Sequence, residues 1–260
     1  MADETVFTDV ERFSSGGISH SVFKKGSGPG VLLMHELPGM TPEFWRLANW
    51  LAEDFTVWAP DLFGDDNTPT TPNTATLTFR ACISREIHLF DKDDPGPITQ
   101  WLRALARYLS DQTEGHGIGV IGMCMTGNFA LTLALDPFVS APVTSQPGLP
   151  GSLPWKKQDD GLQMTASEKA DLAARDVDVM GLRFAGDKLC KAARFDAIRD
   201  VIGAERFKEH VIADEHRNPD GKLKFPHSCL TADLVDDDDS VTRQKLGEVV
   251  SFLKARIAPV

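Results

Sequence analysis

The sequence has no apolar run close to the ~20 residues that a helix needs to cross a bilayer. Residues 1–13 are acidic and lack the basic and then apolar pattern of a secretory signal peptide. The sequence also lacks an excess of basic residues, since its formal net charge is -11 at pH 7. An acidic surface does not attract phosphate backbones or anionic lipid. We therefore expect neither a nucleic acid nor a membrane as a partner.

Cysteine is scarce, with 4 residues in 260. The four are Cys82, Cys124, Cys190 and Cys229. No two of them form a CxxC pair, and no Cys/His cluster has the spacing of a zinc finger. The sequence therefore predicts free thiols, a reducing cytoplasm and no metal site.

What the sequence does contain is an alternation of short apolar segments and amphipathic helices. Residues 31–35 and 179–184 are largely apolar runs that are typical of buried strands. Thr41 and Pro42 have the residue types of a helix start, and apolar residues then recur at helical spacing. This alternation predicts an α/β protein with a mostly parallel central sheet and helices on both faces. Residues 5–23 predict an antiparallel hairpin at the N-terminus.

The remaining segments follow the same alternation, within one predicted domain that spans residues 1–260. Further strands are expected at residues 56–59, 117–121, 138–143 and 210–213. Further helices are expected at residues 98–109, 125–135, 195–202 and 246–257. Residues 64–78 and 146–160 are rich in turn-forming residues, which predicts loops.

A strand meets a helix at residues 121–128, which read Ile-Gly-Met-Cys-Met-Thr-Gly-Asn. Small residues flank Cys124 as they do in a nucleophile elbow, here with cysteine in place of serine. Such a turn projects its side chain at the carboxyl edge of the sheet, and the helix N-terminus favours a thiolate. The backbone N–H of Met125 would face a substrate oxyanion. Cys124 is therefore the candidate nucleophile, although many free cysteines are simply small buried hydrophobes.

Two residues in the appropriate chain order could complete a catalytic triad with Cys124. Asp187 follows an expected strand at its carboxyl end. His227 lies between the last expected strand and the closing helix. His210 and His216 flank the preceding strand and are weaker candidates. A nucleophile, an acid and a histidine in this order favour hydrolysis over a structural role for each residue alone.

With these elements, the sequence resembles the dienelactone hydrolase family over nearly its whole length, which implies an α/β-hydrolase fold. The resemblance rests on Gly122-x-Cys124-x-Thr126-Gly127, Gly186-Asp187, Pro226-His227 and the run His-Glu-Leu-Pro-Gly at residues 35–39. It implies a Cys–His–Asp triad made by Cys124, His227 and Asp187. It also implies that Glu36 contacts the resting cysteine and takes part in its activation. The backbone N–H groups of Leu37 and Met125 are the implied oxyanion hole.

The sequence departs from this family at two places. The family more often has glycine at the position of Thr126, where a side chain could change the pocket. Its prototype binds the carboxylate of its substrate with two arginines, one just after the catalytic histidine, whereas residues 228–231 here are Ser-Cys-Leu-Thr. Arg80 and Arg85 lie in the appropriate region, and for each a role in substrate binding and a surface or ion-paired role stay open. The resemblance therefore implies hydrolysis without fixing dienelactone as the substrate.

Together these features predict a hydrolase that cleaves a small-molecule ester or lactone through an acyl-enzyme, with no metal or organic cofactor. A thioesterase or acyltransferase on the same fold is an alternative, since it differs only in what resolves the acyl-enzyme. A non-hydrolytic protein in which Cys124 is a redox-sensing or structural thiol is an alternative from another class. Such a thiol would need neither Asp187 nor His227. The oligomeric state stays open.

Overall fold

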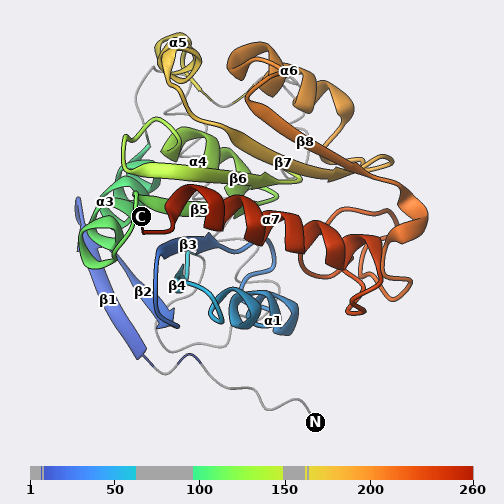
Figure 1. The fold of residues 1–260 in the computed structure, drawn as a ribbon, viewed down its shortest axis with the longest axis horizontal. Coiled ribbons are helices and arrows are strands. Elements are labelled where there is room, and N and C mark those ends of the chain that lie inside the picture. The colour runs from blue at the N-terminus through green and yellow to red at the C-terminus, as the bar shows by residue number, and fades with distance from the viewer. Residues whose placement is uncertain (1–6, 8, 63–95, 149–161, 163, 260) are drawn as a thin grey trace.

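The computed structural model describes residues 7, 9–62, 96–148, 162 and 164–259 (Figure 1). These residues form a sheet of 8 strands in the order β1-β2-β4-β3-β5-β6-β7-β8. The strands are β1 (Asp9–Ser15), β2 (Ile18–Lys25), β3 (Gly30–Met34), β4 (Thr56–Pro60), β5 (Ile118–Met123), β6 (Val139–Ser145), β7 (Val179–Phe184) and β8 (Phe207–Ile212). β2 pairs antiparallel with both β1 and β4, and all the other neighbouring strands pair parallel. The mostly parallel sheet and the N-terminal hairpin are confirmed.

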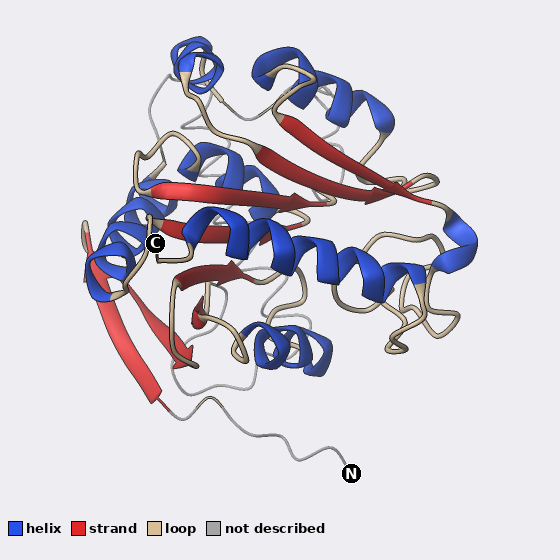
Figure 2. Ribbon diagram, in the orientation of Figure 1, coloured by secondary structure: helices blue, strands red, loops and turns tan. Residues whose placement is uncertain are grey.

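Helices cover both faces of the sheet (Figure 2). They are α1 (Pro42–Leu51), α3 (Pro97–Gln112), α4 (Thr126–Leu133), α5 (Ala166–Ala174), α6 (Ala192–Ile202) and α7 (Val241–Ile257). α1 and α7 pack on one face, and α3, α4, α5 and α6 pack on the other. In β5, Val120 packs toward α3 and α4, whereas Ile121 packs toward α1 and α7. Such a strand is apolar throughout because both of its faces are buried.

The start of α1 follows its predicted physical signals. Thr41 caps the helix by accepting a hydrogen bond from the Phe44 N–H, and Pro42 occupies the first helical position. The buried residues of this helix are Phe44, Leu47, Ala48 and Leu51. They recur at helical spacing, so the local pattern determines which side of α1 faces the core.

Other elements differ from the sequence-based expectation. α5 was not expected, although it begins with a capping box in which Thr165 and Glu168 each accept a hydrogen bond from the backbone N–H of the other. β8 begins at Phe207, whose ring packs against Phe195 of α6 at a centroid distance of 5.2 Å. The loop expected at residues 64–78, and most of the one at 146–160, lie outside the described residues.

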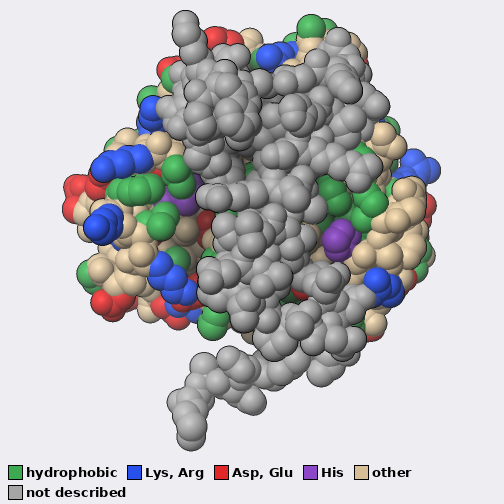
Figure 3. Space-filling view, turned by 180° about the vertical axis from the view of Figure 1, so that it is seen from behind, with side chains coloured by type: hydrophobic (Ala, Val, Ile, Leu, Met, Phe, Trp, Pro, Cys, Tyr) green, Lys and Arg blue, Asp and Glu red, His purple; other side chains and the backbone are tan. Residues whose placement is uncertain are grey.

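The described surface that is visible from behind carries acidic and basic side chains interspersed with one another (Figure 3). The large apolar side chains most exposed in the described residues, Val10, Val211 and Leu223, are far apart in the sequence. Within the described part of the chain, no helix combines the length and the apolar character that a bilayer crossing requires.

Candidate active site

The parallel strands all run in one direction, so their carboxyl ends meet at one edge of the sheet (Figure 1). Cys124 lies there, between the end of β5 and the start of α4. Its φ angle is +54°, in the left-handed region that residues with a Cβ rarely adopt. Hydrogen bonds fix this conformation, because the Cys124 N–H donates to the Ser145 carbonyl and the N–H of Gly127 donates to the Cys124 carbonyl. The strained turn presents the thiol as a nucleophile elbow does.

Two glycines make this turn sterically feasible. A Cβ on Gly122 would lie 2.2 Å from the Thr126 carbonyl oxygen, which is part of the rigid start of α4. A Cβ on Gly127 would lie 2.9 Å from the Thr144 hydroxyl. The small residues around Cys124 are therefore required by the close approach of β5, α4 and β6.

We predict that Gly122→Ala lowers the free energy of unfolding by about 3 kcal/mol or more, because backbone must move to admit the methyl group. Gly247→Ala is the matched control. Gly247 lies in α7, and a Cβ there would meet no atom within 4 Å. The control is expected to be neutral or stabilising by up to about 1 kcal/mol. Urea unfolding of both variants measures the difference, and equal midpoints would contradict the steric account of the elbow.

Thr126 is fully buried. Its hydroxyl oxygen accepts a hydrogen bond from the Met123 N–H at 2.8 Å. It also lies 3.2 Å from the carbonyl oxygens of both Met34 and His35, at the end of β3. Its side chain therefore joins the elbow to the neighbouring strand end.

Asp187 and His227 lie in contact, although 40 positions separate them in the sequence. His227 Nδ1 is 2.7 Å from Asp187 Oδ2, and both residues are buried. Asp187 Oδ1 accepts hydrogen bonds from the backbone N–H groups of Leu189 and Cys190, at 2.8 and 3.0 Å. The second ring nitrogen of His227, Nε2, has no hydrogen-bonding partner among the described residues. The aspartate thus orients the ring through Nδ1 and leaves Nε2 open for chemistry.

Cys124 lies close enough to influence the charge of this imidazole, although Nε2 makes no hydrogen bond of ordinary geometry to a described residue. Burial by itself lowers the pKa of His227, but the hydrogen bond that the ring donates to Asp187 and the interaction with Cys124 outweigh burial and raise the pKa to about 11. Both interactions favour the protonated form of the ring. A positively charged imidazole next to a cysteine favours the thiolate, which is the nucleophilic form.

The loop that carries His227 is held by Asp233, a residue that the sequence patterns did not single out. Asp233 Oδ2 accepts hydrogen bonds from the backbone N–H groups of His227 and Ser228, at 2.8 and 3.0 Å. Its other oxygen lies 3.0 Å from the guanidinium of Arg217. A side chain that binds backbone across a loop has no periodic signal in sequence, so only the folded chain reveals it.

Glu36 follows β3 and is buried at the same edge. Its Oε2 accepts hydrogen bonds from Gln146 Nε2 at 3.1 Å and from the Ser228 hydroxyl at 3.0 Å, and its Oε1 accepts one from the Thr231 hydroxyl. Burial raises the pKa of Glu36, while the charge of His227 and the three hydrogen bonds partly oppose this rise. In the described part of the chain, none of the hydrogen bonds of this carboxylate reaches Cys124.

The expected oxyanion hole combines two backbone segments at this edge. Leu37 follows Glu36, whose carbonyl accepts a hydrogen bond from the Gly39 N–H at 2.8 Å. Met125 follows Cys124 and precedes α4. Neither the Leu37 N–H nor the Met125 N–H donates a hydrogen bond to another described residue. The predicted substrate-binding residues Arg80 and Arg85 lie outside the described residues.

His35 holds the segment that precedes Glu36. The ring is fully buried, its Nε2 accepts a hydrogen bond from the Leu62 N–H at 3.1 Å, and its Nδ1 donates one to the Glu36 carbonyl. This pattern requires the neutral imidazole, because protonated Nε2 could not accept. Burial is the largest cause that lowers the pKa of His35.

We predict that His35 makes the protein less stable in acid. Its folded-state pKa lies below its unfolded value, so the unfolded chain binds more protons and stability falls as the pH drops below about 6.5. Each proton contributes a slope of at most about 1.4 kcal/mol per pH unit. Urea unfolding of wild type and His35→Gln at several pH values around 6.5 measures how the free energy of unfolding depends on pH. The variant should be less stable at neutral pH with a shallower slope, and parallel slopes would exclude His35 as the source.

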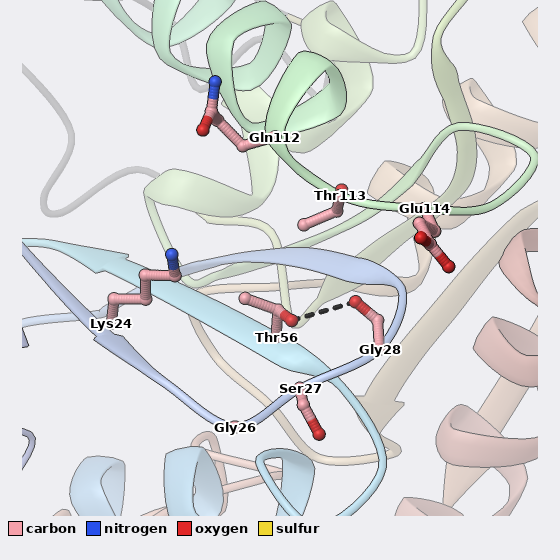
Figure 4. Close-up of a pocket in the computed structure, with 8 residues that line it drawn as sticks. All are labelled: Lys24, Gly26, Ser27, Gly28, Thr56, Gln112, Thr113 and Glu114. Atoms are coloured by element: carbon pink, nitrogen blue, oxygen red, sulfur yellow. Dashed lines mark hydrogen bonds between the residues drawn. The ribbon is translucent and has the colours of Figure 1, made fainter.

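The weaker candidates lie elsewhere. His210 Nδ1 is 3.2 Å from Glu248 of α7, and His216 lies in a short 3-10 helix at Asp214–His216. An open cleft at the amino ends of β3 and β4 lies at the opposite edge of the sheet from Cys124 (Figure 4). Its side chains do not converge on one point, and the hydrogen bond drawn in it joins the Thr56 hydroxyl to the Gly28 carbonyl. Cys124 therefore lies in the better candidate site.

Comparison with known proteins agrees with this arrangement. Residues 19–175 match the model of the dienelactone hydrolase family. A carboxymethylenebutenolidase from Rhodococcus opacus is 34% identical over 116 residues, which cover 44% of this chain and 42% of that protein. The chain thus matches less than half the length of this curated relative.

Several solved structures are similar over almost the whole chain. A dienelactone hydrolase-like promiscuous phosphotriesterase from metagenomic libraries has a TM-score of 0.62 at 17% identity, covering 95% of this chain and 98% of that one. A putative dienelactone hydrolase from Klebsiella pneumoniae subsp. pneumoniae MGH 78578 has a TM-score of 0.61 at 16% identity, covering 94% and 98%. The thioesterase domain from the curacin biosynthetic pathway has a TM-score of 0.57 at 11% identity, covering 94% and 99%. With the sheet described above, these similarities show the α/β-hydrolase fold.

Proposed function

Because the chain belongs to the dienelactone hydrolase family, we propose that it hydrolyses small carboxylic esters or lactones with Cys124 as the nucleophile. The observation that carries this proposal is the 2.7 Å contact between His227 and Asp187 next to the strained turn at Cys124. A structural thiol needs neither an oriented imidazole nor a left-handed turn. Together they are the parts of a cysteine-based acyl-transfer site.

The proposed reaction has two stages. In the first, the Cys124 thiolate attacks the carbonyl carbon, and the oxyanion is stabilised by the N–H groups of Leu37 and Met125. His227 Nε2 then gives its proton to the leaving alkoxide, which yields a thioester on Cys124. In the second, His227 takes a proton from water, the hydroxide attacks the thioester, and the carbon–sulfur bond breaks to release the carboxylic acid and restore the Cys124 thiolate beside the protonated His227. Asp187 keeps the ring oriented through both stages, and no cofactor takes part in the proposed reaction.

We assign Glu36 a part in controlling the thiol. A second carboxylate near a cysteine opposes the thiolate or accepts its proton, and burial raises the pKa of Glu36, which favours the protonated form more than in an exposed glutamate. In the described structure the carboxylate is bound by Gln146, Ser228 and Thr231. Any contact with Cys124 would be made in addition to these three hydrogen bonds or in place of one of them.

The proposal is tested with a panel of lactones and short-chain aryl and thioesters. Wild type should release one equivalent of the aryl alcohol in a burst, and mass spectrometry of the trapped enzyme should locate the acyl group on the peptide that contains Cys124. Preference for the thioester, or transfer of the acyl group to an added alcohol, would identify a thioesterase or acyltransferase. Turnover without acylation of Cys124 would contradict the proposed nucleophile.

A further inference from the structure

Gln146 follows β6 at the carboxyl edge and shares an unusual property with Cys124. These are the two non-glycine residues of the described chain with a positive φ, which is +35° at Gln146. Such a conformation costs about 1–3 kcal/mol and persists only where the surroundings fix it. Gln146 is fully buried, and its N–H donates to the Leu182 carbonyl of β7 at 2.6 Å. Contacts with the rest of the fold therefore keep Gln146 in a backbone conformation that glutamine rarely adopts.

The side-chain amide of Gln146 is hydrogen bonded at both ends. Its Oε1 accepts from the Cys229 N–H at 3.3 Å and from the Ser145 hydroxyl. Its Nε2 donates to Glu36 Oε2 at 3.1 Å. Because a backbone N–H can only donate, the oxygen must face Cys229 and the nitrogen must face Glu36. One side chain thus joins the loop after β3 to the loop that carries His227.

The backbone of the histidine loop is bound at three consecutive positions. Asp233 accepts from the N–H groups of His227 and Ser228, and Gln146 accepts from that of Cys229. Ser228 also donates its hydroxyl to Glu36. The position of His227 and the orientation of Glu36 therefore depend on the same small network.

We propose that Gln146 is a positioning residue that couples Glu36 to the His227 loop. Its amide holds the Glu36 carboxylate against Ser228, and holds the loop so that the imidazole meets both Cys124 and Asp187. The inference rests on the proposed function only for its catalytic readout. Gln146 acts through these hydrogen bonds and touches no reacting atom.

Gln146→Glu tests the coupling through its pH dependence. While the introduced carboxyl group is protonated, it keeps both interactions, because its carbonyl oxygen accepts from Cys229 and its O–H donates to Glu36. Once ionised, the introduced group loses the donor and repels the Glu36 carboxylate. We compare two rates with those of wild type at the same pH, namely kcat and the rate of Cys124 alkylation by iodoacetamide. Both should lie within about threefold of wild type near pH 5.5 and at least tenfold below wild type by about pH 8.5.

Gln146→Met removes the hydrogen bonds to Glu36, Cys229 and Ser145 at every pH. It should lower kcat by about tenfold across the range while KM stays within about twofold, because positioning is lost and substrate contacts are not. Gln112→Glu is the matched control, since Gln112 is exposed at the end of α3. The ratio of its kcat and alkylation rate to those of wild type should not vary with pH. Urea unfolding establishes that each variant is folded at each pH.

The outcomes separate this inference from the proposed function. The alkylation arm uses no substrate, so it reports on Gln146 even where no ester is turned over. If the ratio of the Gln146→Glu alkylation rate to the wild-type rate does not change with pH, the coupling to Glu36 is overturned. Wild-type kcat in folded Gln146→Met would overturn the positioning role. If Gln146→Glu does not fold, Gln146→Met carries the test, and a wild-type rate of Cys124 alkylation in that folded variant overturns the coupling.

Discussion

Cys124→Ala is expected to abolish the hydrolysis of activated esters and lactones while the fold stays intact. Loss of the thiol removes the acyl-enzyme route, and the remaining site offers only binding and the two oxyanion N–H groups. Removal of a triad nucleophile typically costs roughly 10⁴-fold or more in kcat. Alanine also has a Cβ, so the strain at a φ of +54° is unchanged and the loss of one buried sulfur costs only about 1 kcal/mol.

Initial rates on the best substrate of the panel, together with circular dichroism and urea unfolding, measure this effect. Cys190→Ala is the matched control, because Cys190 is also a buried free thiol and burial raises its pKa well above the ordinary value. That variant should lose some stability and retain its activity. Wild-type rates in Cys124→Ala would exclude the proposed nucleophile. Loss of hydrolysis in Cys190→Ala alone would place the reacting thiol at Cys190 instead of Cys124.

Asp187→Asn is expected to lower kcat by about 10³–10⁴-fold with little change in structure. The reason lies in the hydrogen bonds of Asp187. Its Oδ1 accepts from the N–H groups of Leu189 and Cys190, so the asparagine carbonyl must take that place and its NH₂ must face His227. His227 Nδ1 then has to accept a hydrogen bond, and the ring proton moves to Nε2, the nitrogen that the reaction needs as a base.

The same substitution should lower the pKa of His227. Burial lowers this pKa, and the hydrogen bond that His227 donates to Asp187 is the first of the interactions that raise it to about 11 in the native protein. NMR titration of the imidazole in wild type and variant measures the shift and identifies the tautomer. Asp176→Asn, the same change at an exposed position, is the control and should leave both readouts unchanged. An unshifted His227 with full activity in Asp187→Asn would contradict the triad.

Local patterns in the sequence were enough to identify the strand–turn–helix around Cys124. The small residues at Gly122 and Gly127 are dictated by contacts within a few residues or across one strand, as the 2.2 and 2.9 Å approaches of a Cβ show. The start of α1 at Thr41 was predictable for the same reason, because capping and helical periodicity are short-range effects. α5 was missed because its apolar side is short, with Leu172 as its buried residue.

The α/β alternation, the elbow at Cys124 and the chain order of Asp187 and His227 could all be inferred from the residues alone. The surroundings of these residues became apparent only in the folded chain. Gln146, Ser228 and Thr231 reach Glu36 across 110, 192 and 195 positions in the sequence. Hydrogen bonds over such separations leave no periodic or compositional signal, because they depend on which strand ends the sheet brings to one edge. The candidate nucleophile is therefore apparent in the sequence, whereas the hydrogen-bond network around Glu36 and the His227 loop is a product of the tertiary fold.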